Sequence, residues 1–443
     1  MSNTANNPMK ISMIMLGCPK NDVDAEAMLY QLREAGHEII SDPEQADAII
    51  VNTCGFIKDA KQQSVDTLLE MAEFRKNGRC RLLVATGCLT QRYQDQLFDA
   101  LPEVDMMVGV NDYGRIAELL EETGGRRLVC ADQAAMPELG GRVLSTPKGY
   151  AYLKIAEGCS NRCAYCAIPD IRGPYRSRQE TDVLREAEWL AGQGVPEIIL
   201  VAQDTTRYGM DHASGQPLVS LLKKLVRIDD IGRLRLLYCY PELVSDELLE
   251  IVNSEPKVCS YLDIPLQHID DGMLKRMNRR SGEAQIRALI EKIRNNYDIT
   301  LRTTFITGFP GEDEAAYQKL LGFVKDSRFD NLGVFEFSPE EGTPAFSMRP
   351  KVPLRVSKSR RHEIMMAQQD ISRELLAMKV GMVLPVVCDG IADTGGMVCR
   401  TEGQAPEIDG VTYVDNIGEE MLGKQFNIKI TESNEYDLRG VNV

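Results

Sequence analysis

Several features that mark membrane, secreted and nucleic-acid-binding proteins are missing from this sequence. No stretch approaches about 18 uninterrupted apolar residues, which argues against a membrane-spanning helix. The opening residues 1–10 are polar and lack an apolar core segment, so we expect no secretory signal and a cytoplasmic protein. The net charge is −15 and the pI is near 5.0. A protein of this charge can follow a phosphate backbone only through a local basic patch.

Histidine is also scarce, whereas cysteine is not. The chain has only four His residues against 12 Cys residues. So many thiols in a reducing compartment do not indicate a disulfide framework, and we expect some of them to bind metal. A length of 443 residues exceeds one ordinary core, so we expect two to four domains.

The first segment, residues 8–135, alternates short apolar runs with amphipathic stretches. Strands are expected over three runs, Lys10–Leu16, Ala48–Asn52 and Arg81–Ala85. Helices are expected over Asp24–Ala35 and Ile57–Arg75. This alternation predicts an α/β fold, a three-layer domain in which helical crossovers cover both faces of a parallel sheet.

The second segment, residues 145–375, repeats the alternation six times. Its expected strands are Tyr150–Ala156, Glu197–Ala202, Arg233–Cys239, Tyr261–Ile264, Thr300–Phe305 and Leu332–Phe337. Its clearest expected helices are Glu180–Ala191, Glu314–Lys325 and Val356–Met378. Six βα units in series predict an open, partial (β/α)6 barrel rather than a closed eight-stranded one.

The last segment, residues 379–443, has a different pattern. Short β-type runs such as Val383–Val387 and Phe426–Ile430 alternate with Gly, Asp and Asn residues, and helical periodicity is weak. This length and pattern predict a small antiparallel β barrel.

One group of cysteines lies on a single short stretch after an expected strand. Cys159, Cys163 and Cys166 form a CxxxCxxC motif. Iron–sulfur clusters bind Cys thiolates and usually have four ligand positions, so three local ligands leave one iron open for chemistry. Structural zinc is the alternative, but it normally takes four ligands in two separated pairs, and no His lies near the motif. The motif therefore predicts a catalytic iron–sulfur cluster.

Three further cysteines each follow an expected strand of the first segment. Cys18, Cys54 and Cys88 are spaced by about one βα repeat. Because loops at the carboxyl ends of parallel strands gather at one edge, the three thiols can meet in one crevice. The alternative is that each is a small buried hydrophobic residue. Three equivalent positions favour a second cluster. The remaining cysteines show no such placement and are expected to be structural: Cys80, Cys130, Cys239, Cys259, Cys388 and Cys399.

Four residues near the CxxxCxxC motif are weaker candidates, each with an ordinary alternative. Arg172, Arg176 and Arg178 can hold an anionic group bidentately or can form a solvated surface run. Tyr165, between the second and third cysteines, can pack on an adenine ring or merely on the barrel.

Other candidates lie at the ends of expected barrel strands. Gln203 and Asp204 end the second of these strands, where barrel enzymes place functional side chains. The segment Gly308–Glu312 can admit a ligand close to the backbone or can form a plain turn, and His268 is equally ambiguous.

Together these motifs resemble the methylthiotransferases, a subgroup of the radical S-adenosylmethionine (SAM) enzymes. The resemblance covers essentially the whole chain: an N-terminal domain with three spaced cysteines, a CxxxCxxC barrel and a C-terminal TRAM-like β barrel. Within this group, four stretches resemble the RimO branch, which modifies ribosomal protein S12, rather than the tRNA branch: Gly17–Asn21, Asn52–Ile57, Ile171–Arg178 and Asp263–His268.

The resemblance implies a radical reaction at the CxxxCxxC motif. Cys159, Cys163 and Cys166 would bind a 4Fe–4S cluster whose open iron chelates SAM, with Tyr165 and Gln203 as candidate contacts to SAM. Reductive cleavage of SAM would give a 5′-deoxyadenosyl radical. This radical would abstract hydrogen from the β-carbon of one aspartate of S12.

The resemblance also implies a second cluster and a set of partners. Cys18, Cys54 and Cys88 would bind an auxiliary 4Fe–4S cluster that presents sulfur to the carbon radical. A second SAM would supply the methyl group, and the product would be 3-methylthioaspartate. The implied partners are S12, free or in the small ribosomal subunit, and a low-potential electron donor such as flavodoxin or ferredoxin. No membrane and no sequence-specific nucleic acid are expected as partners.

The charge of the last segment itself favours a protein substrate. Residues 381–443 hold four Lys and Arg against eleven Asp and Glu, a net charge of −7. A barrel that bound RNA would need a positive groove, whereas an acidic barrel complements a basic ribosomal protein. Two alternatives stay open, namely tRNA adenosine methylthiolation on the same scaffold and an iron–sulfur binding protein without radical chemistry.

Overall fold

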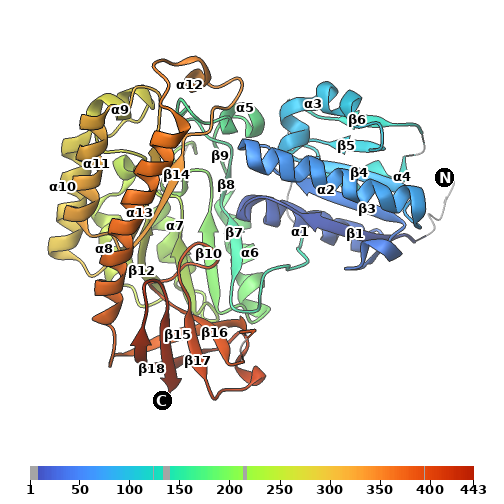
Figure 1. Cartoon of the computed structure of the whole chain (residues 1–443). Helices are drawn as coiled ribbons and strands as arrows, with labels where there is room; N and C mark the ends of the chain where they lie inside the picture. Colours follow the sequence, from blue (N-terminus) through green and yellow to red (C-terminus); the bar gives the residue numbers. More distant parts are fainter. Residues whose placement is uncertain (1–7, 123, 133–139, 213–216, 394) are drawn as a thin grey trace. The chain divides into compact units, whose positions relative to one another are not determined.

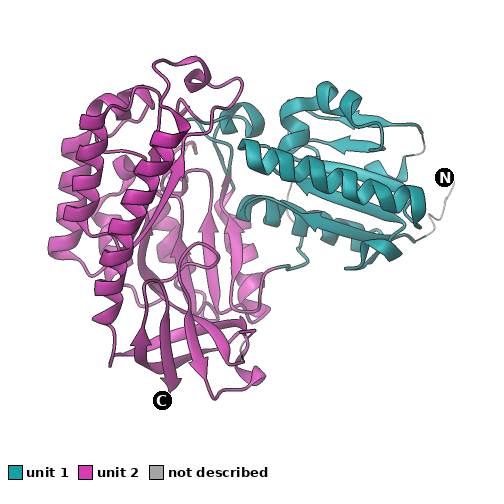
Figure 2. Ribbon diagram, in the orientation of Figure 1, with its two compact units in different colours: residues 1–145, 157–160, 166–178 teal, residues 146–156, 161–165, 179–443 magenta. Residues whose placement is uncertain are grey.

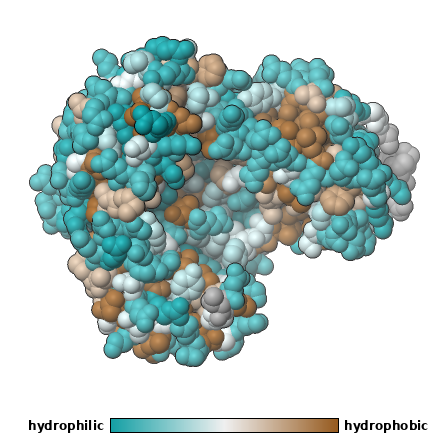
Figure 3. Space-filling model, in the orientation of Figure 1, coloured by the Kyte–Doolittle hydropathy of each residue, from teal (hydrophilic) through white to brown (hydrophobic). Residues whose placement is uncertain are grey.

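The computed structural model describes residues 8–122, 124–132, 140–212, 217–393 and 395–443, which form two compact units (Figures 1 and 2). The first unit comprises residues up to 145 together with 157–160 and 166–178, and the second comprises 146–156, 161–165 and 179–443. On the face shown in Figure 3, hydrophilic residues cover most of the surface of each unit. Among the described residues, none of the helices combines the length and the apolarity that a membrane span requires.

The first unit contains a six-stranded parallel sheet with the order β2-β1-β3-β4-β5-β6. Its strands are β1 (Lys10–Met15), β2 (Glu38–Ile39), β3 (Ala48–Thr53), β4 (Leu82–Gly87), β5 (Met106–Val108) and β6 (Arg127–Val129). The three strands that the sequence predicts are present. The sequence did not predict β2, β5 and β6, because runs of two or three residues are too short to show a periodic pattern.

Helices cover both faces of this sheet, as predicted. Helices α1 (Pro19–Glu34) and α4 (Ile116–Glu121) pack on one face, and α2 (Lys58–Asn77) and α3 (Cys88–Ala100) pack on the other. Strand β3 is buried along its whole length, and its successive residues Ile49 and Ile50 enter opposite cores. A strand buried on both faces is a continuous apolar run, which is why this strand was easy to predict.

The second unit contains another parallel sheet, with the order β14-β13-β12-β11-β10-β7. Its strands are β7 (Ala151–Lys154), β10 (Glu197–Val201), β11 (Arg233–Leu236), β12 (Val258–Asp263), β13 (Thr300–Thr307) and β14 (Asn331–Glu336). The sequential order, with β7 and β14 at the two edges of the sheet, confirms the predicted open (β/α)6 arrangement. The predicted first strand continues after Ile155 as the short β8 (Ala156–Glu157).

Helices follow most strands of this sheet (Figure 1). They are α6 (Glu180–Gly192), α7 (Leu218–Leu225), α8 (Asp246–Ser254), α9 (Asp271–Arg276), α10 (Glu283–Asn296), α11 (Glu314–Ser327), α12 (Pro344–Ser347) and α13 (Leu354–Ala377). Two short elements follow the CxxxCxxC motif, α5 (Ile168–Arg172) and β9 (Arg176–Ser177).

The C-terminal segment forms a closed five-stranded barrel with the order β15-β16-β17-β19-β18. The strands are β15 (Val383–Ile391), β16 (Met397–Thr401), β17 (Thr412–Asp415), β18 (Gln425–Ser433) and β19 (Leu438–Asn442). The prediction of a small barrel is confirmed, but its purely antiparallel character is wrong, because β17 and β19 pair in parallel. Strand directions cannot alternate all the way around a closed ring with an odd number of strands, so one pair must be parallel.

Buried charged groups join this barrel to the sheet of the second unit. Oε1 of Glu197, the first residue of β10, accepts hydrogen bonds from Arg235 Nε at 2.7 Å and from Arg400 Nη1 at 3.0 Å. Nearby, Tyr261 Oη donates to Asp409 Oδ2 at 2.7 Å. The barrel therefore covers the amino ends of the strands. The loops at the opposite, carboxyl ends are where barrel enzymes place their chemistry.

Candidate active site

In the first unit, three cysteines follow three neighbouring strands of the sheet. Cys18 precedes α1 after β1, Cys54 follows β3, and Cys88 begins α3 directly after β4. All three are free thiols. Burial raises the pKa of Cys88 to about 12; Arg172 opposes this shift, and the neighbouring thiols of Cys18 and Cys54 add to it. The structure thus brings the three thiols to one edge of the sheet, as the βα spacing predicts.

This edge includes the point where the strand order reverses, since β1 lies between β2 and β3. Open α/β sheets bind their ligands outside the carboxyl ends of the strands at such a point. Asn21 Nδ2 joins the loops on its two sides by donating to the carbonyl oxygens of Leu16 at 3.0 Å and Thr53 at 3.1 Å. Gly17 has a φ of +113°, and a Cβ there would lie 2.7 Å from Asn21 Nδ2. Only glycine therefore fits beside Asn21.

A buried arginine lies beside these thiols. Arg172, at the end of α5, has a side chain that is 1% exposed. Its Nη1 donates to Glu157 Oε2 at 2.8 Å, and its Nη2 donates to Asp24 Oδ2 at 3.1 Å. The alternative in which these arginines form a solvated surface run is therefore wrong for Arg172. Arg178 is buried as well, and Arg176 donates to the Arg172 carbonyl oxygen.

The donors at this edge fit an anionic iron–sulfur cluster. Cysteine thiolates are the usual ligands of such clusters, and Arg172 supplies a positive charge within the same buried region. The Nε atom of Arg172 is buried and has no hydrogen-bond acceptor among the described residues. The described residues include no three His, Cys, Asp or Glu side chains arranged around a single metal ion. A cluster does not require that arrangement, because each thiolate binds a different iron.

The CxxxCxxC loop begins directly after β8. Cys159 and Cys166 belong to the first unit and Cys163 belongs to the second, and Cys159 and Cys163 are buried. Within the first unit, the Cys159 amide donates to the Gly173 carbonyl oxygen at 3.1 Å. Gly158 has a φ of +72°, and a Cβ there would lie 2.6 Å from the same oxygen. The segment that contains Gly173 therefore fixes the start of the motif.

Within the second unit, the end of β10 supports the middle of the same loop. Asn161 Nδ2 donates to Asp204 Oδ2 at 2.8 Å, and Arg207 Nη2 donates to Asn161 Oδ1 at 3.0 Å. Asp204 is fully buried, so this carboxylate positions the loop rather than facing solvent. Gln203, predicted to contact SAM, is partly buried at the same strand end.

The other candidates of the second unit form a packed group. The ring of Tyr165 packs edge-on against Phe309 with centroids 6.4 Å apart. This contact corresponds to the alternative in which Tyr165 packs on the barrel. Gly308 donates its amide to the Glu312 carboxylate, which closes the segment Gly308–Glu312 as a turn. His268 is fully buried, and its Nε2 lies 3.5 Å from Glu312 Oε1.

Two residues that contact the CxxxCxxC motif could not be selected from the sequence pattern. Tyr240 Oη lies 3.6 Å from Cys163 Sγ, and Arg279 Nη1 lies 3.8 Å from the same sulfur. They are 77 and 116 residues from Cys163 along the chain. Neither belongs to a recognisable motif, so only the folded sheet reveals them.

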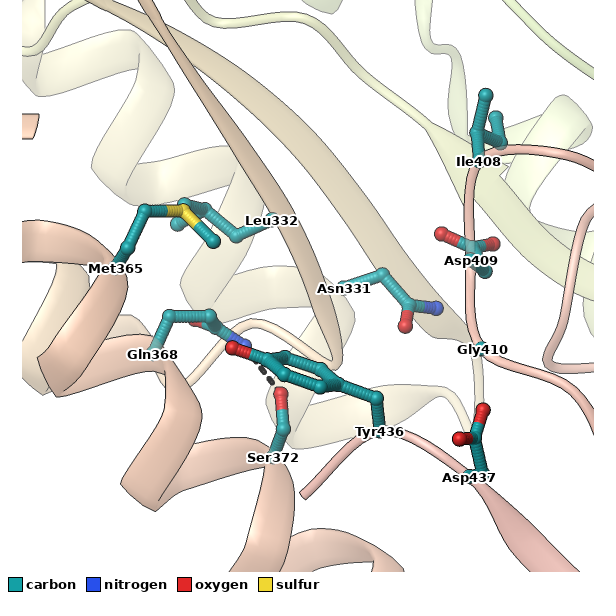
Figure 4. A pocket seen from close by; sticks show the side chains of 10 residues that line it. All are labelled: Asn331, Leu332, Met365, Gln368, Ser372, Ile408, Asp409, Gly410, Tyr436 and Asp437. Atoms are coloured by element: carbon teal, nitrogen blue, oxygen red, sulfur yellow. Dashed lines mark hydrogen bonds between the residues drawn. The ribbon is translucent and has the colours of Figure 1, made fainter. Parts of the chain in front are cut away.

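A separate pocket lies between α13, the start of β14 and two loops of the C-terminal barrel (Figure 4). Its volume is about 380 Å³, and Gln368, Asn331, Tyr436 and Asp437 are among its lining residues. It contains none of the candidate site residues. It also lies beside the first residue of β14, at the amino end of the sheet, so it is not the active site.

Comparisons with known proteins agree with this organisation. The uncharacterized protein family UPF0004 matches residues 10–109, the radical SAM superfamily matches residues 153–324, and the TRAM domain matches residues 380–443. The ribosomal protein uS12 methylthiotransferase RimO of Syntrophotalea carbinolica is 49% identical over 97% of this chain and 96% of its own length. The chain belongs to the RimO family of radical SAM methylthiotransferases.

Further relatives extend the comparison. The uS12 methylthiotransferase RimO of Geobacter sulfurreducens is 47% identical over 98% of this chain and 99% of its own length. Among solved structures, the radical SAM methyltransferase TsrM of Kitasatospora setae has a TM-score of 0.57 at 15% identity, covering 77% of each chain. The cobalamin-dependent enzyme OxsB has a TM-score of 0.56 at 13% identity, covering 81% of this chain and 56% of its own. At these identities the two structures show a shared fold. The RimO relatives confirm the methylthiotransferase resemblance.

Proposed function

We propose that the protein transfers a methylthio group to the β-carbon of an aspartate in ribosomal protein uS12, giving 3-methylthioaspartate. The observation that carries the proposal is the gathering of Cys18, Cys54 and Cys88 around a buried cation in a chain that also has a radical SAM motif. Relatives named ribosomal protein uS12 methylthiotransferases are 47% and 49% identical to this chain over nearly its whole length, and they support the choice of substrate.

Two sets of three cysteines would hold two 4Fe–4S clusters. The sets are Cys18, Cys54 and Cys88, and Cys159, Cys163 and Cys166. When bound, the clusters and SAM supply the electron, the radical, the sulfur and the methyl group. The chain positions these groups: Asp204 holds Asn161 of the motif, and Arg172 compensates negative charge near Cys88. We propose Tyr165 and Gln203 as contacts to SAM.

The proposed partners follow from the same chemistry. Reductive cleavage of SAM needs a low-potential electron donor such as flavodoxin or ferredoxin. The −7 charge of residues 381–443 complements a basic ribosomal protein and disfavours RNA. We therefore favour uS12, free or in the small ribosomal subunit, over tRNA.

The test is an anaerobic assay with reconstituted protein, SAM, a strong reductant and either uS12 or bulk tRNA. Mass spectrometry of peptides should find a methylthio addition on one aspartate of uS12, and digested tRNA should stay unmodified. The Cys159→Ala variant should be inactive. The matched control Cys80→Ala, which changes a buried thiol outside both sets, should stay active. A methylthio group on tRNA and none on uS12 would refute the proposal.

A further inference from the structure

A buried arginine and a tyrosine meet at one sulfur of the CxxxCxxC motif. Cys163 Sγ lies 3.6 Å from Tyr240 Oη and 3.8 Å from Arg279 Nη1. The guanidinium carbon of Arg279 lies 4.3 Å from the centre of the Tyr240 ring, so the two side chains stack. The second nitrogen, Nη2, donates to the Pro265 carbonyl oxygen at 2.9 Å. The guanidinium is thus held in one orientation, with Nη1 directed at the sulfur.

The backbone before Arg279 is attached to the motif loop itself. The Ala164 amide donates to the Met277 carbonyl oxygen at 2.9 Å, and Asn278 Nδ2 donates to the Arg162 carbonyl oxygen at 2.8 Å. These bonds lie on both sides of Cys163 in the sequence. The distance between the guanidinium and the sulfur is therefore fixed by the fold, and not by a flexible side chain reaching across solvent.

The buried guanidinium of Arg279 lacks a carboxylate partner among the described residues. Arg279 is 9% exposed, and it forms no ion pair with any Asp or Glu in the described part of the chain. A buried cation without a counter-charge is strongly unfavourable. Cys163 Sγ lies 3.8 Å from Arg279 Nη1, and it becomes negative when it binds iron as a thiolate.

Iron binding also determines which atom donates the hydrogen bond between Tyr240 and Cys163. Either atom can donate while Cys163 carries its proton. A metal-bound thiolate has no proton, so the tyrosine hydroxyl must then donate to the sulfur. Cys163 would accept two hydrogen bonds, one of them charge-assisted. Hydrogen bonds to ligand sulfurs are among the features that set the reduction potential of an iron–sulfur cluster.

We propose that Arg279 and Tyr240 are positioning residues that raise the reduction potential of the cluster bound through Cys163. Reduction adds negative charge to the cluster and its thiolates. A nearby cation and two hydrogen-bond donors stabilise the reduced form more than the oxidised form, so a biological donor can supply the electron. The inference rests on the proposed function for the presence of that cluster, and it assigns these two residues a role in it.

The test measures potential rather than turnover. Arg279→Gln, Arg279→Lys and Tyr240→Phe are made in the full chain with Cys18, Cys54 and Cys88 replaced by Ala, which leaves one cluster to observe. Arg280→Gln is the matched control, because Arg280 is the adjacent arginine and is exposed. Iron content and an anaerobic redox titration followed by electron paramagnetic resonance are recorded for each protein.

We expect every variant to keep its iron and the Arg280→Gln midpoint to stay unchanged. At the potential that half-reduces the parent cluster, Arg279→Gln should show about a tenfold lower ratio of reduced to oxidised cluster, or about 59 mV for one electron. Tyr240→Phe should shift less in the same direction, and Arg279→Lys should recover part of the loss.

Unchanged midpoints in Arg279→Gln and Tyr240→Phe would overturn the inference. If Arg279→Gln loses its iron, the near-isosteric Tyr240→Phe and the charge-conserving Arg279→Lys decide, and unchanged midpoints in both would overturn it. A parent protein that binds no 4Fe–4S cluster at the CxxxCxxC motif would instead contradict the proposed function. The two failures are thus distinguishable.

Discussion

Arg172 is an arginine whose surroundings could not be inferred from its neighbours in the sequence. It lies in a run with Arg176 and Arg178, a pattern equally typical of an anion site and of a solvated surface. The carboxylates that bind it, Glu157 and Asp24, are 15 and 148 residues away. Charge composition alone cannot show which distant acids will meet a given guanidinium.

Replacing Arg172 should affect both the stability of the protein and its metal content. Arg172→Ala leaves two buried carboxylates without their cation, which should cost about 3 kcal/mol of unfolding free energy. The protein should also lose much of the iron bound by Cys18, Cys54 and Cys88, because the cation beside that cluster is gone. Urea unfolding and iron analysis measure the two effects.

Two further variants separate these effects. Arg172→Lys keeps the charge and should retain more iron than Arg172→Ala. The exposed Arg185→Ala should change neither quantity, since its side chain is 71% exposed. Full iron content in Arg172→Ala would show that the cation does not support the cluster.

At the scale of elements, strands with a clear apolar pattern could be predicted from the sequence. Features without such a local pattern could not. The apolar runs of β3 and β10, which are buried along their whole length, indicate strands of parallel sheets covered on both faces. The three cysteines at the ends of β1, β3 and β4 were predicted to meet because βα repeats place successive loops at one edge. The parallel β17–β19 pair was missed, because the direction of a barrel strand depends on how the whole ring closes.

The two cysteine sets should bind iron independently, since they lie on different elements. Reconstituted protein should hold about eight irons, as two 4Fe–4S clusters. Replacing Cys18, Cys54 and Cys88 by Ala should leave about half of this iron and preserve some SAM cleavage. Iron analysis and an assay of 5′-deoxyadenosine measure these outcomes.

The complementary variant replaces the three cysteines of the CxxxCxxC motif by Ala. It should also keep about half of the iron, and its SAM cleavage should be abolished, because the open iron is lost. If the first variant retained all of the iron, the three strand-end cysteines would not be cluster ligands.

At the scale of the whole molecule, Glu197 joins the C-terminal barrel to the central sheet. Burial alone would raise the pKa of Glu197, but the guanidinium groups of Arg235 and Arg400 lower it to about 2. The folded-state pKa is thus below its ordinary value of 4.5, so the stabilisation is complete above pH 4.5 and is lost as pH falls toward 2.

Glu197→Gln should weaken the attachment of the barrel by about 3–5 kcal/mol at neutral pH, because three arginines lose a buried partner. Thermal unfolding should begin at a lower temperature, and limited proteolysis should cleave between α13 and β15. The variant should also lose less stability than the parent between pH 4.5 and 2. If the variant and the parent lost the same stability between pH 4.5 and 2, other carboxylates would control how stability depends on acid pH.

The acidic surface of the barrel should guide a basic substrate, although not every acid contributes. Asp409 is buried against Tyr261 and Arg302, so it belongs to the attachment and not to the surface. Exposed acids remain on the outside of the barrel. Reversing three of them to Lys should weaken uS12 binding and reduce its salt dependence, and SAM cleavage without substrate should not change. The three are Glu419, Glu420 and Glu432.

Binding measured across a salt series tests this expectation. The control reverses three exposed acids on helices of the central sheet, namely Glu188, Glu250 and Glu291. It makes the same change in net charge away from the barrel and should bind uS12 better than the barrel variant. Equal weakening in both would show that total charge, and not the barrel, attracts the substrate.

If the barrel binds the substrate as proposed, its position at the amino ends of the strands also sets a minimum substrate length. Strand β13 has eight residues, so the two ends of the sheet are roughly 25 Å apart at about 3.3 Å per residue. A peptide that carries only the residues next to the modified aspartate cannot reach from the carboxyl ends to the barrel. Recognition by the barrel therefore requires at least about eight further extended residues, or a folded partner of that width, so fragments shorter than this must bind through the catalytic loops alone.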